Sequence, residues 1–477
     1  MKILFVTNLF PPHVVGGYEM GCLMHAQAAQ RAGHDVMVAT SLSFGGLQKQ
    51  SSVPGVAVRQ IFEPVFDYEF GDRVYQRPLN YASPGGIHPG NCLALSEMIR
   101  TWQPDAIWMH NPLGLGPVGI LETAAASGVP TVVHLMDFLD EGIRLSQHGF
   151  EISGRWAAAK SGVHAIACSQ GTLEDNSRIG RYASAIVVPG GIEVDALACR
   201  RAGDQMNFPV NGPVRMVSFG QLKSHKGVQH VVAALGVLRT WMKLDVELHL
   251  IGSCEAAFET NLRAIAKAAR CDGAIHWHGR KNRSDLHELL ATMHLAVLPL
   301  NDKEAFGYVA PEAALHGMCV AIGRNAGCSE VFPDGYPYLL SARDDPNMIA
   351  ATVRRMIVDG EERRCWERRL ASHIVDRCDL DRVVLPRCLA YIEGLVAASS
   401  RSGASVISAE ESLERSLAAW QMNRNLARLL GDEGPAPEDK QRRLSRRLNR
   451  VLRRVVPPAF QYQLKTLANM VRRRRAA

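Results

Sequence analysis

Two glutamates that stand eight positions apart, Glu304 and Glu312, have the type and spacing to bind sugar hydroxyls. Pro311 is acceptable in a first helical turn, so we expect a helix to begin near Val309, with Glu304 in the loop before it. At helical rise the two carboxylates would lie about 10 Å apart or slightly more. A nucleotide-sugar separates its sugar from its ribose by a similar length, and a carboxylate can accept hydrogen bonds from adjacent hydroxyls. Spacing alone nevertheless favours a simpler interpretation, in which two surface glutamates flank a structural helix.

A basic turn, from Ser218 to Gly227, supplies a second signal because it joins a predicted strand to a predicted helix. Backbone amides at such a turn, with a nearby cation, can hold a phosphate. Lys226 is that cation, and it would neutralise the charge that builds on a departing diphosphate. On this segment alone, a solvated basic loop is equally consistent with the sequence.

Paired glycines, Gly16 and Gly17, follow the first predicted strand and give a third, weaker signal. Without a Cβ, the backbone of this paired-glycine loop can approach a ligand closely. The pattern is not G-x-G-x-x-G, so a dinucleotide-binding fingerprint is absent.

Short β-rich runs alternate with helical runs twice along the chain, which predicts two α/β domains with parallel sheets. We expect the first domain at residues 1–205 and the second at 206–398, with the last helix of the second returning to the first. Ligands of parallel sheets bind beyond the carboxyl ends of the strands, so two such edges would face each other across a cleft. Residues 399–477 are expected to form a helical, basic extension.

The composition is that of a globular protein, since 477 residues, 47% of them hydrophobic, can bury two cores. No uninterrupted apolar run of about eighteen residues occurs, which argues against a transmembrane helix. The eleven cysteines are scattered, without C-x-x-C pairs or zinc-type spacing, and this favours buried free thiols in a reducing compartment. We therefore expect a cytoplasmic protein.

The formal net charge of +7 belongs to the C-terminal tail, since thirteen Lys or Arg and no acidic residue lie beyond position 439. The rest of the chain is mildly acidic, at about −6. Residues 440–477 combine arginines with an apolar stripe, which fits a helix on an anionic membrane surface and equally a solvated helix packed on the body. Nucleic acid is disfavoured as a partner because few aromatic residues are interleaved with these charges.

In combination and order, six motifs resemble those of family 4 glycosyltransferases, over residues 1 to about 395. The resemblance implies the GT-B fold, in which two Rossmann-like domains face each other across a cleft, and transfer of a sugar from a nucleotide-sugar. It also implies a retaining mechanism without a metal or a cofactor, the co-substrate being a UDP- or GDP-linked donor. The motifs are the paired-glycine loop, Gly33–Val36, Pro189–Glu193, Gly220–Gly227, the E-x₇-E pair, and Gly327–Glu330.

Matching positions in this family imply roles for individual residues of the chain. Glu304 would contact the donor sugar as a candidate catalytic residue, while Glu312 would bind the ribose hydroxyls. Lys226, with the amides near Phe306 and Gly307, would hold the diphosphate. From the first domain, the paired-glycine loop would approach the donor and the acceptor.

Two positions depart from the family pattern. Gln221 stands in the phosphate-binding turn where the family often has an arginine, and we still assign it to the donor site. Met136 stands where the family usually places a histidine, although the expected Asp137, a candidate catalytic carboxylate, follows it. His134 lies on the same strand face and would supply the catalytic imidazole only if the strand is displaced; otherwise it is a half-buried strand histidine. His110, at the end of another strand, is assigned either to the acceptor side or to a capping role.

The leading hypothesis is a retaining, metal-independent glycosyltransferase, in the cytosol or on the cytosolic face of a membrane. Its acceptor would be a glycan, a lipid-linked molecule or a small molecule. The alternative from another class is a catalytically inactive GT-B protein that binds sugar nucleotides or acts as a scaffold. Epimerases and phosphorylases share the architecture, but the sequence reveals neither the acid/base residues of the former nor the pyridoxal-lysine site of the latter.

Overall fold

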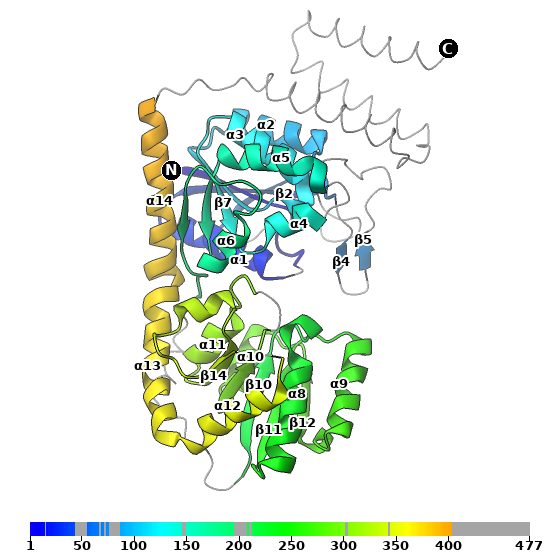
Figure 1. Ribbon diagram of the computed structural model, residues 1–477. Coiled ribbons are helices and arrows are strands. Elements are labelled where there is room, and N and C mark those ends of the chain that lie inside the picture. The colour runs from blue at the N-terminus through cyan, green and yellow to red at the C-terminus, as the bar shows by residue number, and fades with distance from the viewer. Residues whose placement is uncertain are drawn as a thin grey trace, which may run out of the picture.

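The computed structural model contains two α/β domains, one above the other, with two long helices along one side of the pair (Figure 1). This arrangement confirms the predicted fold of two Rossmann-like parallel-sheet domains. The predicted tail helices, including the basic residues 440–477, lie outside the described residues. The structure describes residues 1–14, 16–42, 55–65, 68–70, 73–75, 86–145, 149–194, 208, 212–300, 304–341 and 344–402.

The first domain is built on a seven-stranded sheet in which every adjacent pair is parallel, in the order β3-β2-β1-β6-β7-β8-β9. Its inner strands are apolar on both faces because helices cover both. The strands are β1 (Lys2–Thr7), β2 (Asp35–Ser41), β3 (Ala57–Phe62), β6 (Ala106–Asn111), β7 (Thr131–Leu135), β8 (His164–Ala167) and β9 (Ala185–Val187). The helices are α1 (Gly17–Arg31), α2 (Pro89–Trp102), α3 (Pro117–Ala126), α4 (Leu139–Leu145), α5 (Gly149–Ser161) and α6 (Gln170–Asp175), and a separate hairpin pairs β4 (Tyr68–Phe70) with β5 (Arg73–Tyr75).

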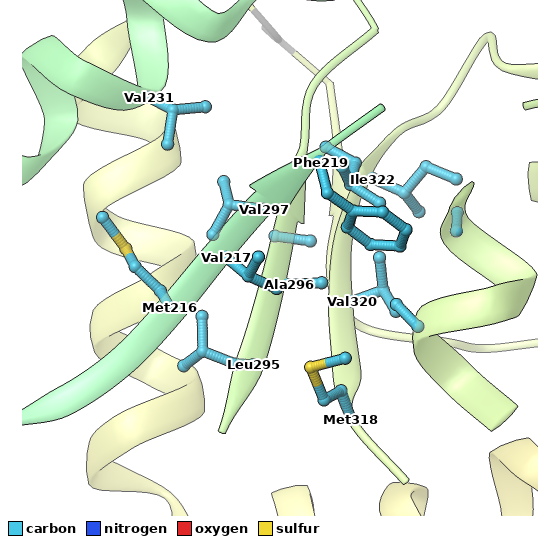
Figure 2. Packing of buried hydrophobic residues seen from close by; sticks show 14 of the residues in the cluster. Met216, Val217, Phe219, Val231, Leu295, Ala296, Val297, Met318, Val320 and Ile322 are labelled. Carbon is cyan, nitrogen blue, oxygen red and sulfur yellow. The ribbon is translucent and has the colours of Figure 1, made fainter. Parts of the chain in front are cut away.

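The second domain repeats this plan with a six-stranded parallel sheet in the order β12-β11-β10-β13-β14-β15. Figure 2 shows how apolar side chains of β10, β13 and β14 pack beside one another to form the middle of its core. The strands are β10 (Val214–Phe219), β11 (Val246–Ile251), β12 (Ile275–Gly279), β13 (Leu295–Leu298), β14 (Cys319–Gly323) and β15 (Leu339–Leu340). The helices are α8 (Val228–Gly236), which continues as a π-helical turn over Val237–Trp241, α9 (Ala256–Ala268), α10 (Arg283–Leu290), α11 (Val309–Leu315) and α12 (Pro346–Val358).

The last two described helices run along both domains (Figure 1). Helix α13 (Gly360–Cys378) packs on the second domain, and α14 (Leu385–Ser402) packs on the first. Leu385, Leu389 and Ile392 of α14 share one buried cluster with Ile3 and Phe5 of β1. Helix α14 therefore completes one face of the first sheet, although it is the last described element of the chain.

The chain crosses between the domains at two adjacent places. The amide of Ile192 donates to the Cys378 carbonyl oxygen at 2.8 Å, and the amide of Leu380 donates to the Ile192 carbonyl oxygen at 3.0 Å. Gly191 has no room for a side chain, because a Cβ there would lie 2.6 Å from Cδ1 of Leu380. This close approach explains the second glycine of the Pro189–Glu193 motif.

The sequence did not predict β3 and β9, which form the two edges of the first sheet. Exposed and partly buried residues alternate in β3, so it lacks the continuous apolar run that marks an inner strand. All cysteines within the described residues are free thiols, and most are buried, as their scattered spacing predicts. Among the described helices, none is long and apolar enough to cross a membrane.

Candidate active site

Lys226 and Glu304 meet at the carboxyl edge of the second sheet, although 78 positions separate them in the chain. Lys226 ends a short 3₁₀ turn between β10 and α8, and its amino group donates to the carboxylate of Glu304, in the loop between β13 and α11. Only 25% of the lysine side chain and 20% of the glutamate side chain are exposed. The amide of Leu300 donates to the Lys226 carbonyl oxygen at 3.2 Å, which fixes one loop against the other.

The loop that carries Glu304 is held in shape by a neighbouring turn. The amide of Gly327 donates to the Glu304 carbonyl oxygen at 2.8 Å, and the amide of Cys328 donates to the Phe306 carbonyl oxygen at 2.7 Å. Gly327 must be glycine, because a Cβ would lie 2.0 Å from the Ala305 carbonyl oxygen. Gly307 has a φ of +88°, in the left-handed region that favours glycine. The Gly327–Glu330 motif therefore positions the first glutamate of the E-x₇-E pair.

The same loop also contacts the first domain. The Ala305 carbonyl oxygen accepts hydrogen bonds from the hydroxyls of Ser169, at 2.9 Å, and Thr172, at 2.8 Å. The carboxylate of Glu330 accepts from the first two amides of α6, at 2.7 and 3.0 Å. Sequence reasoning missed Ser169 and Thr172, although a serine just before a predicted helix is a recognisable helix cap.

Asp137 follows β7 in the first domain and is exposed. The amide of Phe138 donates to the Asp137 carboxylate at 2.8 Å, and the Asn176 side chain donates to the Asp137 carbonyl oxygen at 2.8 Å. Partial loss of hydration between the domains raises the pKa of the Asp137 carboxyl; the negative Glu304 raises it further and the positive Lys226 opposes the rise. Asp137 is thus near enough to the Lys226–Glu304 pair to interact with it electrostatically.

Glu312 lies in the first turn of α11, as the sequence predicts, and is half-buried. Burial raises the pKa of its carboxyl to about 7, against the opposing effect of Arg283. Arg283 in turn pairs with the carboxylate of Glu193 at 2.8 Å. Glu193 belongs to the motif at the domain crossing, so that motif helps to position a cation beside Glu312.

Phe306 is buried and covers the backbone of Gly190, where a Cβ would lie 2.5 Å from Cδ1 of the phenylalanine. Its side chain therefore serves packing between the domains, and only its backbone remains available to a ligand.

Gln221 is exposed in the turn between β10 and α8. In that turn Gly220 has a φ of +106° and approaches β11 so closely that a Cβ on Gly252 would lie 1.7 Å from the Gly220 carbonyl oxygen.

A cavity of about 280 Å³ opens at the carboxyl ends of β10, β11 and β12, next to this turn. Sequence reasoning missed it, although Gly252 directly after a buried strand was an available signal. The cavity adjoins the basic turn between β10 and α8 through Leu222, which forms a β-bridge with Cys254. The lining residues are Leu222, Leu250, Gly252, Ser253, Cys254, Glu259, Trp277, Gly279 and Arg280.

The paired-glycine loop leads into α1. The amide of Gly16 donates to the Glu19 carboxylate at 2.7 Å, which caps the helix. A Cβ added to Gly16 or Gly17 would meet no protein atom within 4 Å. Protein packing therefore does not require glycine here, and the space beside the loop is open.

His110 and His134 lie elsewhere than the sequence suggested. The side chain of His110 is fully buried and that of His134 is 1% exposed. Both rings pack against His25 of α1 in a tilted orientation, at centroid distances of 5.3 Å for His110 and 4.7 Å for His134, and burial lowers the pKa of both well below the usual range. Their strand positions face α1 rather than the open edge, so neither imidazole lines an acceptor pocket or replaces the family histidine.

Met136 takes the place where a catalytic histidine was expected, and its side chain packs on α1. A Cβ on Gly21 would lie 2.6 Å from Cε of this methionine. The hydroxyl of Tyr18 donates to the His134 carbonyl oxygen at 3.1 Å and accepts from the Met136 amide at 3.1 Å. The end of β7 is thus fixed to α1, and in this position the strand supplies no imidazole to the site.

Two models of known protein families together match most of both domains. Residues 204–371 match the family model "Glycosyl transferases group 1", and residues 16–191 match "Glycosyl transferase 4-like domain". A glycogen synthase of Mycobacterium tuberculosis is 26% identical over 377 residues, which are 75% of this chain and 86% of that protein. A D-inositol 3-phosphate glycosyltransferase of Arthrobacter is 28% identical over 158 residues, or 32% of this chain and 37% of that protein.

Solved structures share the fold at low sequence identity. The Anabaena protein HepE in complex with UDP superposes with a TM-score of 0.60 at 19% identity, over 83% of this chain and all of that one. A sucrose-phosphate synthase of Thermosynechococcus elongatus gives a TM-score of 0.62 at 15% identity, over 83% of this chain and 99% of that one. Both likenesses concern the two-domain fold.

Proposed function

Because this chain belongs to the group 1 glycosyltransferases of family 4, we propose that it transfers a sugar from a nucleotide-sugar to a hydroxyl acceptor, with retention of configuration and without a metal. The observation that carries the proposal is the Lys226–Glu304 pair, which the folded chain brings together at the domain boundary beside Asp137. A cation, a sugar-binding carboxylate and a second carboxylate from the other domain are the groups that such a transfer uses.

The donor would lie along the carboxyl edge of the second sheet. Its base would enter the 280 Å³ cavity, and its ribose hydroxyls would donate to Glu312. The diphosphate would displace Glu304 from Lys226, so that the amino group pairs with phosphate and the carboxylate becomes free to accept from the donor sugar. HepE was solved with UDP, which favours a UDP-linked donor here too.

In the proposed reaction the acceptor oxygen forms a bond to the anomeric carbon on the face from which the diphosphate leaves. The bond between that carbon and the phosphate oxygen breaks, and the acceptor proton passes to the departing phosphate. Lys226 stabilises the negative charge on the leaving group, which is where charge develops in the transition state. This route needs no imidazole as a base, because the phosphate itself takes the proton.

Asp137 is the residue of the first domain best placed to act on the acceptor. Loss of hydration raises the pKa of its carboxyl, and the carboxyl interacts electrostatically with Glu304 and Lys226. We propose that it orients the acceptor hydroxyl. The class of acceptor, whether glycan, lipid-linked or small, depends on loops that lie largely outside the described residues.

Calorimetric titration with UDP, GDP and ADP, on wild type and on Glu312→Ala, tests the donor site first. Selective binding of UDP by wild type, weakened in the variant, is the expected result. Turnover is then followed as nucleoside diphosphate release in the presence of candidate acceptors. Folded protein that binds none of the nucleotides would contradict the proposal and favour an inactive scaffold, and so would binding that Glu312→Ala leaves unchanged.

A further inference from the structure

A second group of polar side chains lies on the edge of the second sheet, apart from the site described above. Glu247 and His249 stand two positions apart on β11, so they share a face of the sheet. The register pairs His249 with His276 of the neighbouring strand β12. Because β12 is the edge strand, one side of this group is open to solvent.

The ligand-type atoms of these residues lie within 4.8 Å of one another. The rings of His249 and His276 are stacked at a centroid distance of 4.6 Å, so at least one ring must turn for both to bind one ion. Oε2 of Glu247 lies 3.4 Å from Nε2 of His276 and 3.9 Å from Nε2 of His249. His249 is 8% exposed, and its Nε2 has no hydrogen-bond partner among the described residues. The opposite nitrogen of the same ring, Nδ1, lies 3.0 Å from Nε2 of His278. When Nδ1 of His249 carries the ring proton, it donates a hydrogen bond to Nε2 of His278. The lone pair on Nε2 of His249 then faces Glu247.

From this geometry we propose that Glu247, His249 and His276 bind a divalent transition-metal ion of the zinc class. Two imidazoles and one carboxylate form a common zinc ligand set that leaves a fourth position for water. With metal–ligand bonds of about 2.0–2.1 Å in a tetrahedral site, ligand atoms stand roughly 3.3 Å apart. The Glu247–His276 separation already matches this value, and the Glu247–His249 separation must shorten by about half an ångström.

Access and charge also suit a cation. The His276 side chain is 44% exposed, which gives the ion a route from solvent, and Glu247 supplies a compensating negative charge. Arg215 faces Glu247 in the register of β10 and β11, but its guanidinium donates to the Thr292 carbonyl oxygen at 2.8 Å. The guanidinium is still close enough to act electrostatically on His249, so the Glu247 carboxylate must offset its charge as well as that of the ion.

The cluster of His25, His110 and His134 in the first domain offers an alternative set of three ligands. Its side chains are at most 1% exposed, and no carboxylate belongs to the set. Without a route from solvent or a compensating charge, this cluster suits a packed core better than a metal site.

A metal held by Glu247, His249 and His276 would connect the edge strand β12 to β11. The proposed site uses the face of β11 that carries Glu247 and His249, whereas the cavity is lined by Leu250 and by Gly252, which follows the strand. We therefore expect metal binding to stabilise the fold while leaving nucleotide binding unchanged.

Equilibrium dialysis of the chelator-treated full chain against Zn²⁺ tests the proposal directly. Wild type should bind one equivalent, and Co²⁺ in its place should give the visible spectrum of a tetrahedral site. His276→Ala and Glu247→Gln, which remove ligands, should each weaken Zn²⁺ binding about 100-fold, and His278→Ala, which removes only the support of His249, about tenfold. His373→Ala and Glu255→Gln, matched changes elsewhere in the second domain, should bind as wild type.

Thermal unfolding of the same proteins gives a second measurement. Zn²⁺ should raise the midpoint for wild type and both controls, and should fail to do so for His276→Ala. We expect a micromolar dissociation constant for Zn²⁺. If folded wild type takes up no zinc at a free Zn²⁺ concentration about 100-fold higher, the proposal is overturned. Full retention of zinc in the Glu247→Gln/His276→Ala double variant would also overturn it, and loss of that zinc in His25→Ala would then place the metal in the first domain.

Discussion

The two domains follow the same plan but contribute different groups to the site between them. At the carboxyl edge of the second sheet, Lys226, Glu304 and Glu312 are ionisable and partly exposed. At the facing edge of the first sheet, Asp137 and Glu141 are exposed, while His110 and His134 are buried under α1. The difference is consistent with the proposed reaction, in which the second domain would hold the donor and stabilise the leaving group, and the first would close the site and orient the acceptor.

Removal of Lys226 should have the largest effect of any change at this boundary. Lys226→Ala deletes the cation that faces the developing phosphate charge, so kcat should fall by about 10²–10³-fold in a sugar-transfer assay. Lys223→Ala, a change at an exposed lysine of the same turn, should lower kcat by less than about threefold. Equal losses in both variants would show that the turn contributes general positive charge and no specific contact.

Glu312→Gln should weaken nucleotide binding by about tenfold or more, because the amide loses one acceptor and the negative charge that strengthens both hydrogen bonds. Since burial raises the pKa of this carboxyl to about 7, UDP affinity of wild type should increase as the pH rises through 7. The variant should show no such rise. A wild-type affinity that is flat between pH 6 and 8, measured by calorimetry, would remove Glu312 from the ribose site.

Glu312→Gln, which should weaken nucleotide binding, should increase the free energy of unfolding. The folded carboxyl has a pKa near 7 against an ordinary value of 4.5. Between these values it ionises in the unfolded chain first, so wild type loses stability as the pH rises through this window and recovers none above it. Glu312→Gln avoids that loss and should be more stable than wild type at pH 8 by about 1–3 kcal/mol, a gain absent at pH 4. Denaturant unfolding at the two pH values measures this difference.

Glu330→Gln should have a smaller effect that depends on both domains. The carboxylate accepts from two amides of α6 across the boundary, so its neutralisation weakens closure of the site. We expect kcat/KM to fall about tenfold, with UDP affinity unchanged, because the proposed UDP site lies in the second domain. Glu174→Gln on the same helix serves as the matched control, and a loss of UDP affinity in Glu330→Gln would show that the two domains bind the nucleotide jointly.

His110→Phe should have the smallest effect on turnover. The imidazole is fully buried among aromatic rings, and phenylalanine retains its shape in that packing. The expected change in kcat is within about threefold, with any loss limited to the free energy of unfolding. A large loss of kcat in a variant of unchanged stability would mean that the His110 imidazole of the first domain takes part in the reaction.

Local pattern was sufficient to predict the two sheets, the start of α11 and the loop position of Glu304, because apolar strands, glycine turns and a proline in a first helical turn act over a few residues. It failed for His110 and His134, whose side-chain direction depends on which face α1 covers. It also missed Ser169 and Thr172, since their partner, the Ala305 carbonyl oxygen, is more than 130 positions away. Contacts between domains leave little trace in a single sequence.

The position of α14 determines when the first domain can finish folding during synthesis. Residues 1–194 leave the ribosome first, yet the face of β1 that carries Ile3 and Phe5 is covered by a helix made about two hundred residues later. Helix α1 covers part of this face, and until α14 is made the remainder stays open to solvent and to other nascent chains. A fragment that stops near residue 384 should therefore aggregate during expression. The first domain can complete its fold only after α14 has been synthesised.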